Sequence, residues 1–578
     1  MKKYMKAHWM EYVFALLLIG IAGIGISVLF GYSFSTNDDA MLRNIVTGNY
    51  TGTPDAHLVY IMYPLGWIWK CLYQIAPMVP WYDLFMTGMH YVCWFALTVR
   101  AVQIARTRPE KIITGILTLG CIAVIDLPYL VMHQYTVLAA LLASVAIFWL
   151  VTGREKSGCE YWIERVICIV LMILCLWLRK QVFFMALPIG FLILIKEILS
   201  EKKEEQKRCL KNIGIFLGVI LGATILSFVI ESIAYSSESW KDYKIYNEAR
   251  TDIYDYCGVP KYEEYEQEYQ NLGITYGDWV VMDHYDNGLI NDLTSDKMVR
   301  IAEWSVAEKE EARQYYSVWR KGIYSVVEIL LYNQVQPAGV ILSILYVLGL
   351  LCAYKHNDKT GFVCICAMLL FQSVFVGYFM EQGRFPERIS YGLYFMQICF
   401  LVGVILKRCL ADYHQTKREK FWMIAIIALS LMVLSVAGLY RVRMTLNETQ
   451  EVRTDIEDWN YVNEYFAANA DKKYCIITKP FVFSKEAMFQ NSKAESNNLI
   501  RLGSWIQNSP LEELHNERIG VNAVAESVLS GENIFLVEES GADLWWLDSY
   551  LSDKEKTAAV VETITAPGGR SFDIIEVK

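Results

Sequence analysis

The sequence predicts an α-helical polytopic membrane protein with about eleven transmembrane helices and a C-terminal extracytoplasmic α/β domain. Its composition is 54% hydrophobic and only 20% charged, and the mean hydropathy is +0.26, which is typical of a membrane protein with sizeable soluble parts. Apolar runs long enough to cross a bilayer recur along the chain, and alternate short loops between them are basic. The net charge of -9 argues against a nucleic-acid partner.

The first apolar run sets the predicted orientation. It follows Lys2, Lys3 and Lys6, and lysines favour the cytoplasmic side of a membrane. The run is too long for the apolar part of a signal peptide, so we interpret it as a retained helix. An odd number of crossings then places the N-terminus inside and the C-terminal domain outside the plasma membrane. The predicted crossings are residues 10–30, 81–106, 112–131, 133–151, 164–178, 181–195, 212–234, 337–354, 361–380, 389–406 and 421–440.

Residues 58–76 are apolar and aromatic, but we predict that they do not cross. Arg108 and Lys111 mark a later loop as cytoplasmic, so the crossing before that loop must run from outside to inside. A further crossing at residues 58–76 would reverse every later assignment, and Pro64 interrupts this run. We therefore expect a helix that lies in the outer interface, within a first outer loop at residues 32–80.

The whole chain divides into three predicted parts. A transmembrane domain covers residues 1–440 and carries an outer helical insertion at residues 235–336, whereas residues 441–578 form the α/β domain. Within the insertion we expect helices at residues 240–256, 262–272 and 295–332. In the α/β domain we expect helices that start at capping boxes at residues 454–457 and 509–512, a further helix at 542–551, strands at 473–478 and 533–538, and a hairpin formed by residues 558–565 and 571–577.

Two adjacent carboxylates, Asp38 and Asp39, follow the first crossing directly, in the sequence Ser-Thr-Asn-Asp-Asp-Ala-Met. Near a low-dielectric membrane each carboxylate raises the pKa of the other, which is costly unless the pair has a use. In the alternative interpretation, Asn37 or Asp38 caps a short helix at residues 41–46. Neighbours in a helix point about 100° apart, so one carboxylate should cap or orient while the other reacts. We expect Asp38 to cap and Asp39 to act as the base.

Other polar side chains are predicted at the same outer boundary. Each has a structural alternative, such as capping a helix, pairing in a salt bridge or reaching to lipid headgroups. Together, acidic and basic groups at one membrane surface indicate a site that holds a phosphate beside a proton-accepting carboxylate. The candidates are Arg179, Lys180, Arg384 and Arg388 for phosphate binding, and His57, Asp126, His133, Gln134 and Glu381 for substrate binding.

This organisation resembles the GT-C superfamily of integral-membrane glycosyltransferases, which includes arabinosyltransferases, aminoarabinose transferases and protein mannosyltransferases. The resemblance rests on one long span, the Asn-Asp-Asp triplet in the first outer loop, an aromatic interfacial helix, many further spans and an outer C-terminal domain. It implies a GT-C-like fold and a polyprenyl-phosphate sugar donor. It also implies an inverting transfer to a cell-surface glycan or lipid acceptor on the outer face, with Asp38 or Asp39 as the base. The same pair could hold a divalent cation, Mg²⁺ or Mn²⁺, so metal dependence is left open.

Two other classes of protein also act on a lipid-linked saccharide and are alternatives to this function. A polysaccharide ligase or polymerase would use Arg and His residues in a large late outer loop, whereas here the insertion is acidic and rich in tyrosine, with His284 as its only histidine. A transporter or flippase would favour ionisable groups in the middle of the membrane, broken helices and paired repeats. The sequence shows few charges within its spans and no repeat.

Overall fold

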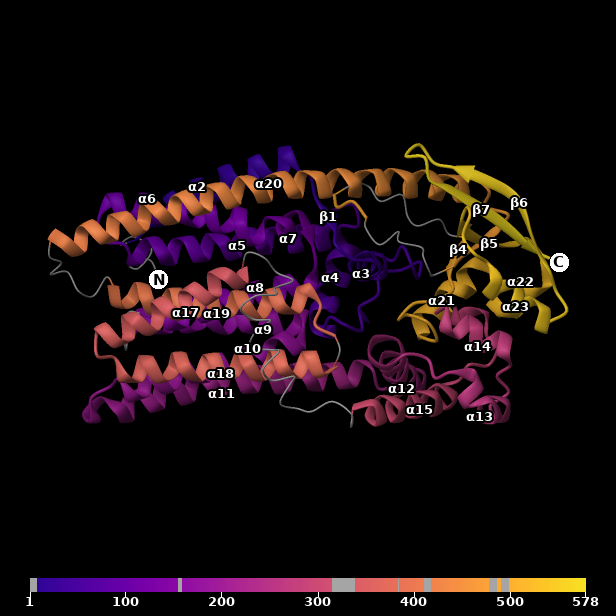
Figure 1. The fold of residues 1–578 in the computed structure, drawn as a ribbon, viewed down its shortest axis with the longest axis horizontal. Coiled ribbons are helices and arrows are strands. Elements are labelled where there is room, and N and C mark those ends of the chain that lie inside the picture. The colour runs from indigo at the N-terminus through magenta and orange to yellow at the C-terminus, as the bar shows by residue number, and fades with distance from the viewer. Residues whose placement is uncertain are drawn as a thin grey trace.

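The computed structural model describes residues 8–153, 158–313, 338–382, 384–409, 417–477, 486–489 and 498–578. The helices form an elongated bundle, and a body of shorter helices and strands lies at one end of it (Figure 1). Within these ranges, nine helices are long and apolar enough to cross a membrane. The chain is therefore a multi-pass membrane protein, and the predicted fold class is confirmed.

Each of the eleven predicted crossings coincides with a helical segment in the described part of the chain. Nine of these segments are the membrane-length helices; α8 is shorter and α5 is less apolar. The segments are α2 (Trp9–Leu29), α5 (Trp81–Ile104), α6 (Arg108–Cys121) continued by η1 (Ile122–Asp126) and α7 (Leu127–Val131), α8 (Tyr135–Val151), α9 (Cys159–Leu178), α10 (Lys180–Leu199), α11 (Lys203–Ala234), α17 (Ala338–Lys355), α18 (Lys359–Gln382), α19 (Glu387–Cys409) and α20 (Lys417–Ala468).

Helix α8 forms the centre of the bundle. Apart from Leu150, all of its residues are buried, and it packs against α5, α9, α10 and α19. A helix that is apolar all round is one that other helices surround, and it does not need to match the full thickness of the lipid. By contrast, α2, α11 and α20 lie at the outside of the bundle and expose large apolar side chains such as Leu16, Leu221 and Leu439.

A layer of short elements connects the bundle to the soluble body. Helices α3 (Asn37–Thr47) and α4 (Tyr63–Ile75) lie in this layer, together with the two-residue strands β1 (Ser33–Phe34) and β2 (Met132–His133), which pair in parallel (Figure 1). Helix α4 has 13 residues and is about 20 Å long, which is too short to cross a bilayer. This agrees with the predicted interfacial helix.

The C-terminal domain is built on a five-stranded sheet in the order β4-β3-β5-β7-β6. Strands β3 (Lys473–Ile476), β4 (Leu499–Arg501) and β5 (Ile534–Glu539) are parallel, whereas β6 (Ala558–Thr565) and β7 (Ser571–Val577) form the predicted antiparallel hairpin. The domain also contains helices α21 (Pro510–Ile519), α22 (Val524–Ser530) and α23 (Trp545–Asp553). Ser509 caps α21 by accepting a hydrogen bond from the Glu512 amide, as the second capping box predicts.

The first predicted capping box, at residues 454–457, does not start a helix. Helix α20 continues through it without a break and runs from the bundle into the C-terminal domain (Figure 1). The Thr454 hydroxyl donates to the Gln450 carbonyl one turn back, 3.2 Å away, as a threonine inside a helix does. No glycine or proline follows Gly438 before the end of the helix, so nothing local stops it.

The described part of the insertion packs against the C-terminal domain. It contains α12 (Glu238–Thr251), η2 (Asp252–Cys257), η3 (Tyr262–Glu264), α13 (Glu266–Asn271), α14 (Tyr276–Asp283), η4 (Asn287–Leu289) and α15 (Ser295–Arg313); the predicted extension to residue 332 lies outside the described residues. Met298 of the insertion and Trp546 of the C-terminal domain belong to one hydrophobic core. The Gly277 amide donates to Asp553 Oδ2, 2.7 Å away. The two segments therefore form one body at the same end of the bundle.

Candidate functional site

The chain enters the site through β1. The Ser35 amide donates to the His133 carbonyl at 2.8 Å, and α3 begins two residues later at Asn37, with Thr36 in the extended N-cap position. The prediction that Asn37 or Asp38 is the N-cap is therefore wrong. Because the helix starts earlier than residue 41, both Asp38 and Asp39 lie in its first turn, where backbone N–H groups favour negative charge.

Asp39 is enclosed by the protein. It has no exposed surface, and its Oδ1 accepts hydrogen bonds from the Tyr82 hydroxyl and the Tyr135 amide, each at 3.1 Å. The Thr36 hydroxyl donates to Oδ2 at 3.2 Å. Burial, together with the neighbouring charge of Asp38, raises the pKa of Asp39 to about 8. Asp39 therefore ties α3 to α5 and α8, and it has no surface with which to contact a substrate.

Asp38 is half-buried, in contrast to its neighbour. Burial raises its pKa above the ordinary value, while the positive charges of Arg388, Arg179 and Arg250 oppose that shift. These three arginines come from the start of α19, the α9–α10 junction and α12. Asp38 is thus a half-buried carboxylate on which the charges of three arginines act, and we call these the arginine cluster (Arg179, Arg250 and Arg388).

Two members of the arginine cluster lack a close ion-pair partner within the described part of the chain. Neither Arg179 nor Arg388 forms a salt bridge with another described residue. Arg179 Nη1 donates to the Tyr135 hydroxyl at 3.3 Å, and its guanidinium lies 5.4 Å from the ring centre of Tyr60. Both arginines are half-buried. Partly desolvated guanidinium groups without a carboxylate partner are suited to hold an oxyanion such as a phosphate.

Arg250 is the member that sequence reasoning missed. It is only 4% exposed, and it donates to the Tyr285 hydroxyl at 2.9 Å and to Asn247 Oδ1 at 2.8 Å. In the sequence it stands in the last turn of a helix inside an acidic insertion, where an arginine is usually explained by the helix dipole. Only the burial of Arg250 distinguishes it from such a residue, and this burial results from the packing of the insertion against the end of the bundle.

The other two predicted phosphate ligands have different surroundings. Arg384 forms a salt bridge with Asp255 Oδ1 at 2.7 Å and lies over the Tyr256 ring, so it fastens η2 of the insertion to the α18–α19 loop. Lys180 is exposed, and its charge acts on Glu231 and Lys244. The structure therefore brings Arg179 and Arg388 to Asp38 and leaves Arg384 and Lys180 at its periphery.

His57 belongs to a separate aromatic cluster. Its Nδ1 lies 2.8 Å from Asp55 Oδ1 and its Nε2 lies 3.2 Å from the Ala234 carbonyl oxygen. The ring stacks on Trp240, with 4.8 Å between ring centres. These contacts join the first outer loop to the junction of α11 and α12. Glu381, the other predicted substrate ligand from the later loops, is exposed at the end of α18.

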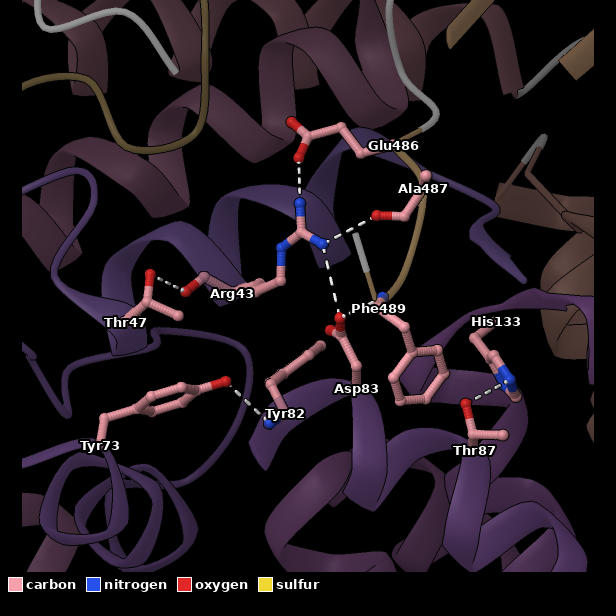
Figure 2. Close-up of polar contacts among 10 residues, drawn as sticks. All are labelled: Arg43, Thr47, Tyr73, Tyr82, Asp83, Thr87, His133, Glu486, Ala487 and Phe489. Atoms are coloured by element: carbon pink, nitrogen blue, oxygen red, sulfur yellow. Dashed lines mark hydrogen bonds and ion pairs between the residues drawn. The ribbon is translucent and has the colours of Figure 1, made fainter. Parts of the chain in front are cut away.

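Three of the predicted substrate ligands are buried inside the protein and contact the helices that carry the site: Asp126, His133 and Gln134. Asp126 accepts hydrogen bonds from the Trp94 indole and from the Tyr391 hydroxyl, which lies one turn beyond Arg388 on α19. His133 Nε2 lies 3.0 Å from the Thr87 hydroxyl (Figure 2). Gln134 caps α8 by accepting from the Val137 amide. These residues position α5, α8 and α19, and Asp126 in particular fixes the turn that carries Arg388.

The carboxylate pair was also a candidate for a divalent cation. The described residues contain no group of three or more His, Cys, Asp or Glu side chains that could hold a metal ion. Mg²⁺ is commonly bound by one or two carboxylates together with substrate phosphate oxygens. A cation at Asp38 would therefore need oxygens from a substrate to complete its coordination.

The fold and the site define a multi-pass membrane protein with a half-buried carboxylate facing an arginine cluster at one end of its helical bundle. No protein-family model and no curated protein matches the chain. The solved structures similar to it include two crystal structures of ArnT from Cupriavidus metallidurans. The apo structure is 11% identical, with 97% of each chain covered and a TM-score of 0.38. The structure bound to undecaprenyl phosphate is 11% identical, with 99% of this chain and 98% of that chain covered and a TM-score of 0.38.

Proposed function

We propose that the protein is a membrane glycosyltransferase that moves a sugar from a polyprenyl-phosphate donor to a hydroxyl of a glycan or lipid acceptor, with inversion at the anomeric carbon. The observation that carries this proposal is that the charges of Arg179, Arg250 and Arg388, from three different elements, act on the half-buried Asp38. A carboxylate beside a cluster of cations provides a proton acceptor and a phosphate site at once. The GT-C-like organisation of the chain agrees with this chemistry.

The arginine cluster binds the donor phosphate in this proposal. When the bond between the anomeric carbon and the phosphate oxygen breaks, negative charge builds up on that oxygen. Guanidinium groups stabilise this charge most strongly where water is excluded, and Arg250 is almost fully buried. Arg179 and Arg388 have no salt-bridge partner among the described residues, so their charge is available to the phosphate.

Asp38 acts as the general base. As the acceptor oxygen attacks the anomeric carbon, its proton passes to the Asp38 carboxylate, the new C–O bond forms, and the polyprenyl phosphate leaves with the bonding electron pair. We assign this role to Asp38 instead of Asp39, the base expected from the sequence, because Asp39 is inaccessible and already accepts three hydrogen bonds. Asp39 holds α3 in the orientation that directs Asp38 toward the arginine cluster.

The location of the site suits a lipid-linked donor. The arginine cluster lies where α9 meets α10 and where α19 begins, at the end of the bundle that carries the soluble body (Figure 1). A polyprenyl chain would extend from this point into the membrane, while the acceptor would approach from the soluble body. We place this end on the outer face of the plasma membrane, as the predicted topology requires.

Direct binding measurements test the phosphate site. Native mass spectrometry of the detergent-purified protein with undecaprenyl phosphate compares wild type with Arg179→Ala, Arg250→Ala and Arg388→Ala. Each variant should weaken binding by about 1.5–3 kcal/mol, because each removes a charge-assisted hydrogen-bond donor. Lys180→Ala, which removes the exposed charge of the residue next to Arg179, is the matched control. Wild-type affinity in all three arginine variants would place the phosphate elsewhere and remove the main support for the proposal.

A further inference from the structure

A short segment of the C-terminal domain contacts the membrane domain beside α3. Residues 486–489, which we call the strap, lie between β3 and β4 in the sequence. The Phe34 amide donates to the Glu486 carbonyl at 2.9 Å, and the Met488 amide donates to the Tyr32 carbonyl at 3.0 Å. The strap thus forms an isolated antiparallel bridge with β1 at Ser33 and Ala487, in the manner of a peptide that pairs with an exposed sheet edge.

Strand β1 is therefore held on both sides. Ser33 pairs with Ala487 of the strap and with Met132 of β2. The next elements along the chain are the N-cap Thr36 and the first turn of α3, which carries Asp38. The backbone leading into the proposed base is thus positioned by the membrane domain on one side and by the C-terminal domain on the other.

Side chains reinforce this contact through Arg43 (Figure 2). Arg43 is 3% exposed, lies on α3 one turn beyond Asp39, and forms a salt bridge with Glu486 of the strap. It also donates to the Ala487 carbonyl at 2.9 Å and lies 3.6 Å from Asp83 Oδ2.

Asp83 links the same guanidinium back to the strap. Its Oδ2 accepts a hydrogen bond from the Phe489 amide at 2.9 Å (Figure 2). The Phe489 ring also packs edge-on against Tyr32, with 5.9 Å between ring centres. A buried charge that loses one partner is strongly unfavourable, so this arrangement opposes separation of the strap from α3.

We propose that the strap is part of the scaffold that positions the reacting carboxylate, and that Arg43 and Glu486 are positioning residues that couple the C-terminal domain to catalysis. This inference rests on the proposed function, in which Asp38 is the base. Arg43 contacts Glu486, Ala487 and Asp83, and none of these belongs to the arginine cluster, so we expect donor binding to be unaffected. The orientation of the first turn of α3 does depend on them, and a displacement of about 1 Å at a reacting group can cost on the order of a hundredfold in rate.

The first test uses Glu486→Gln, which keeps the shape of the side chain but removes its charge. We expect kcat for sugar transfer to fall by at least tenfold, with the affinity for undecaprenyl phosphate unchanged. Glu513→Gln, which neutralises an exposed carboxylate of the same domain, is the matched control and should retain wild-type kcat. A wild-type kcat in Glu486→Gln would overturn the proposal.

A disulfide tests whether kcat depends on docking of the strap against β1. Ser33 and Ala487 form a non-hydrogen-bonded antiparallel pair, in which Cα atoms are about 4.5 Å apart, a separation that a disulfide spans. In a Ser33→Cys/Ala487→Cys/Glu486→Gln variant, oxidation should restore most of kcat and reduction should abolish the rescue. Each single cysteine variant serves as a control. An oxidised cross-link that forms fully without restoring kcat would contradict a positioning role.

Hydrogen exchange separates this inference from the proposed function. In Glu486→Gln we expect amides of α3 to exchange at least tenfold faster, while amides of the shared core around Trp546 exchange as in wild type. If wild type transfers no sugar from any polyprenyl-phosphate donor but α3 still exchanges faster in Glu486→Gln, the proposed reaction is wrong and the role of the strap in positioning α3 is supported. Unchanged exchange in α3 would overturn the strap's role whatever the reaction is.

Discussion

Replacing each of the two adjacent carboxylates by asparagine should produce opposite phenotypes. Asp38→Asn removes the proposed base but leaves the packing of α3 intact. Transfer should fall by a factor of about 10²–10⁴, the usual contribution of a general base. Undecaprenyl phosphate should bind at least as tightly as to wild type, because a negative charge facing Arg179, Arg250 and Arg388 has been removed. Thermal unfolding should change little.

Asp39→Asn should retain most activity near neutral pH. With a pKa of about 8, Asp39 is already mostly protonated there, so the amide replaces a neutral group of the same shape. Its oxygen can still accept from the Tyr82 hydroxyl and the Tyr135 amide. Asp39→Ala removes both acceptors and leaves two buried donors unsatisfied. At about 1–3 kcal/mol for each donor, we expect a destabilisation of about 2–6 kcal/mol.

The assays are sugar transfer in proteoliposomes, from a panel of polyprenyl-phosphate sugars, and thermal unfolding in detergent. The three variants are compared at equal amounts of folded protein, so that loss of stability is not counted as loss of catalysis. If Asp38→Asn transfers sugar at the wild-type rate while Asp39→Asn is inactive, the roles assigned to the two residues are reversed. If both asparagine variants retain the wild-type rate, neither carboxylate is the base.

Further predictions concern pH, topology and packing. The pKa of Asp39 is raised from 3.8 to about 8 in the folded protein, so its protonated form contributes stability that is complete below about pH 4 and is lost as the pH rises through 8. Calorimetry should show this loss in wild type and a weaker one in Asp39→Asn. Cysteines introduced at the exposed Glu264 and Lys203 should react with an impermeant reagent in intact cells only at position 264; labelling at 203 would invert the topology. Gly66→Ala should lower the thermal stability by about 1–3 kcal/mol, because the new Cβ would lie 2.3 Å from a backbone carbonyl oxygen, whereas Gly88→Ala has open space and should unfold as wild type does.

The sequence by itself determined the elements of this protein. Membrane-length helices follow from local hydropathy and length, so a helix lies at each of the eleven predicted crossings, and nine of these helices are long and apolar enough to span a membrane. The alternation of basic loops separated the short run at residues 58–76 from them. The hairpin of β6 and β7 follows from turn residues between two alternating segments. The pair Asp38–Asp39 could be singled out because adjacent carboxylates next to a membrane span are costly.

Tertiary structure alone decided which polar residues meet. Arg179 and Arg388 are 209 positions apart in the numbering of the chain, and Arg250 joins them only because the insertion folds back over the bundle end with the C-terminal domain. His57, Asp126, His133 and Gln134 are polar and were candidates for the site, but each is engaged by neighbours elsewhere: His57 in an aromatic cluster and the other three inside the protein. A sequence pattern cannot reveal such partners.

The different roles of Asp38 and Asp39 also depend on the tertiary structure. Local rules favoured Asp38 as the capping residue, whereas the Tyr82 hydroxyl and the Tyr135 amide, from two other helices, enclose Asp39. Likewise, the strap reaches β1 from more than 450 residues away in the chain. Hydropathy and helix propensity act over a few residues and fix the elements, but burial and charge pairing depend on which elements pack together, and these decide the chemistry of the site.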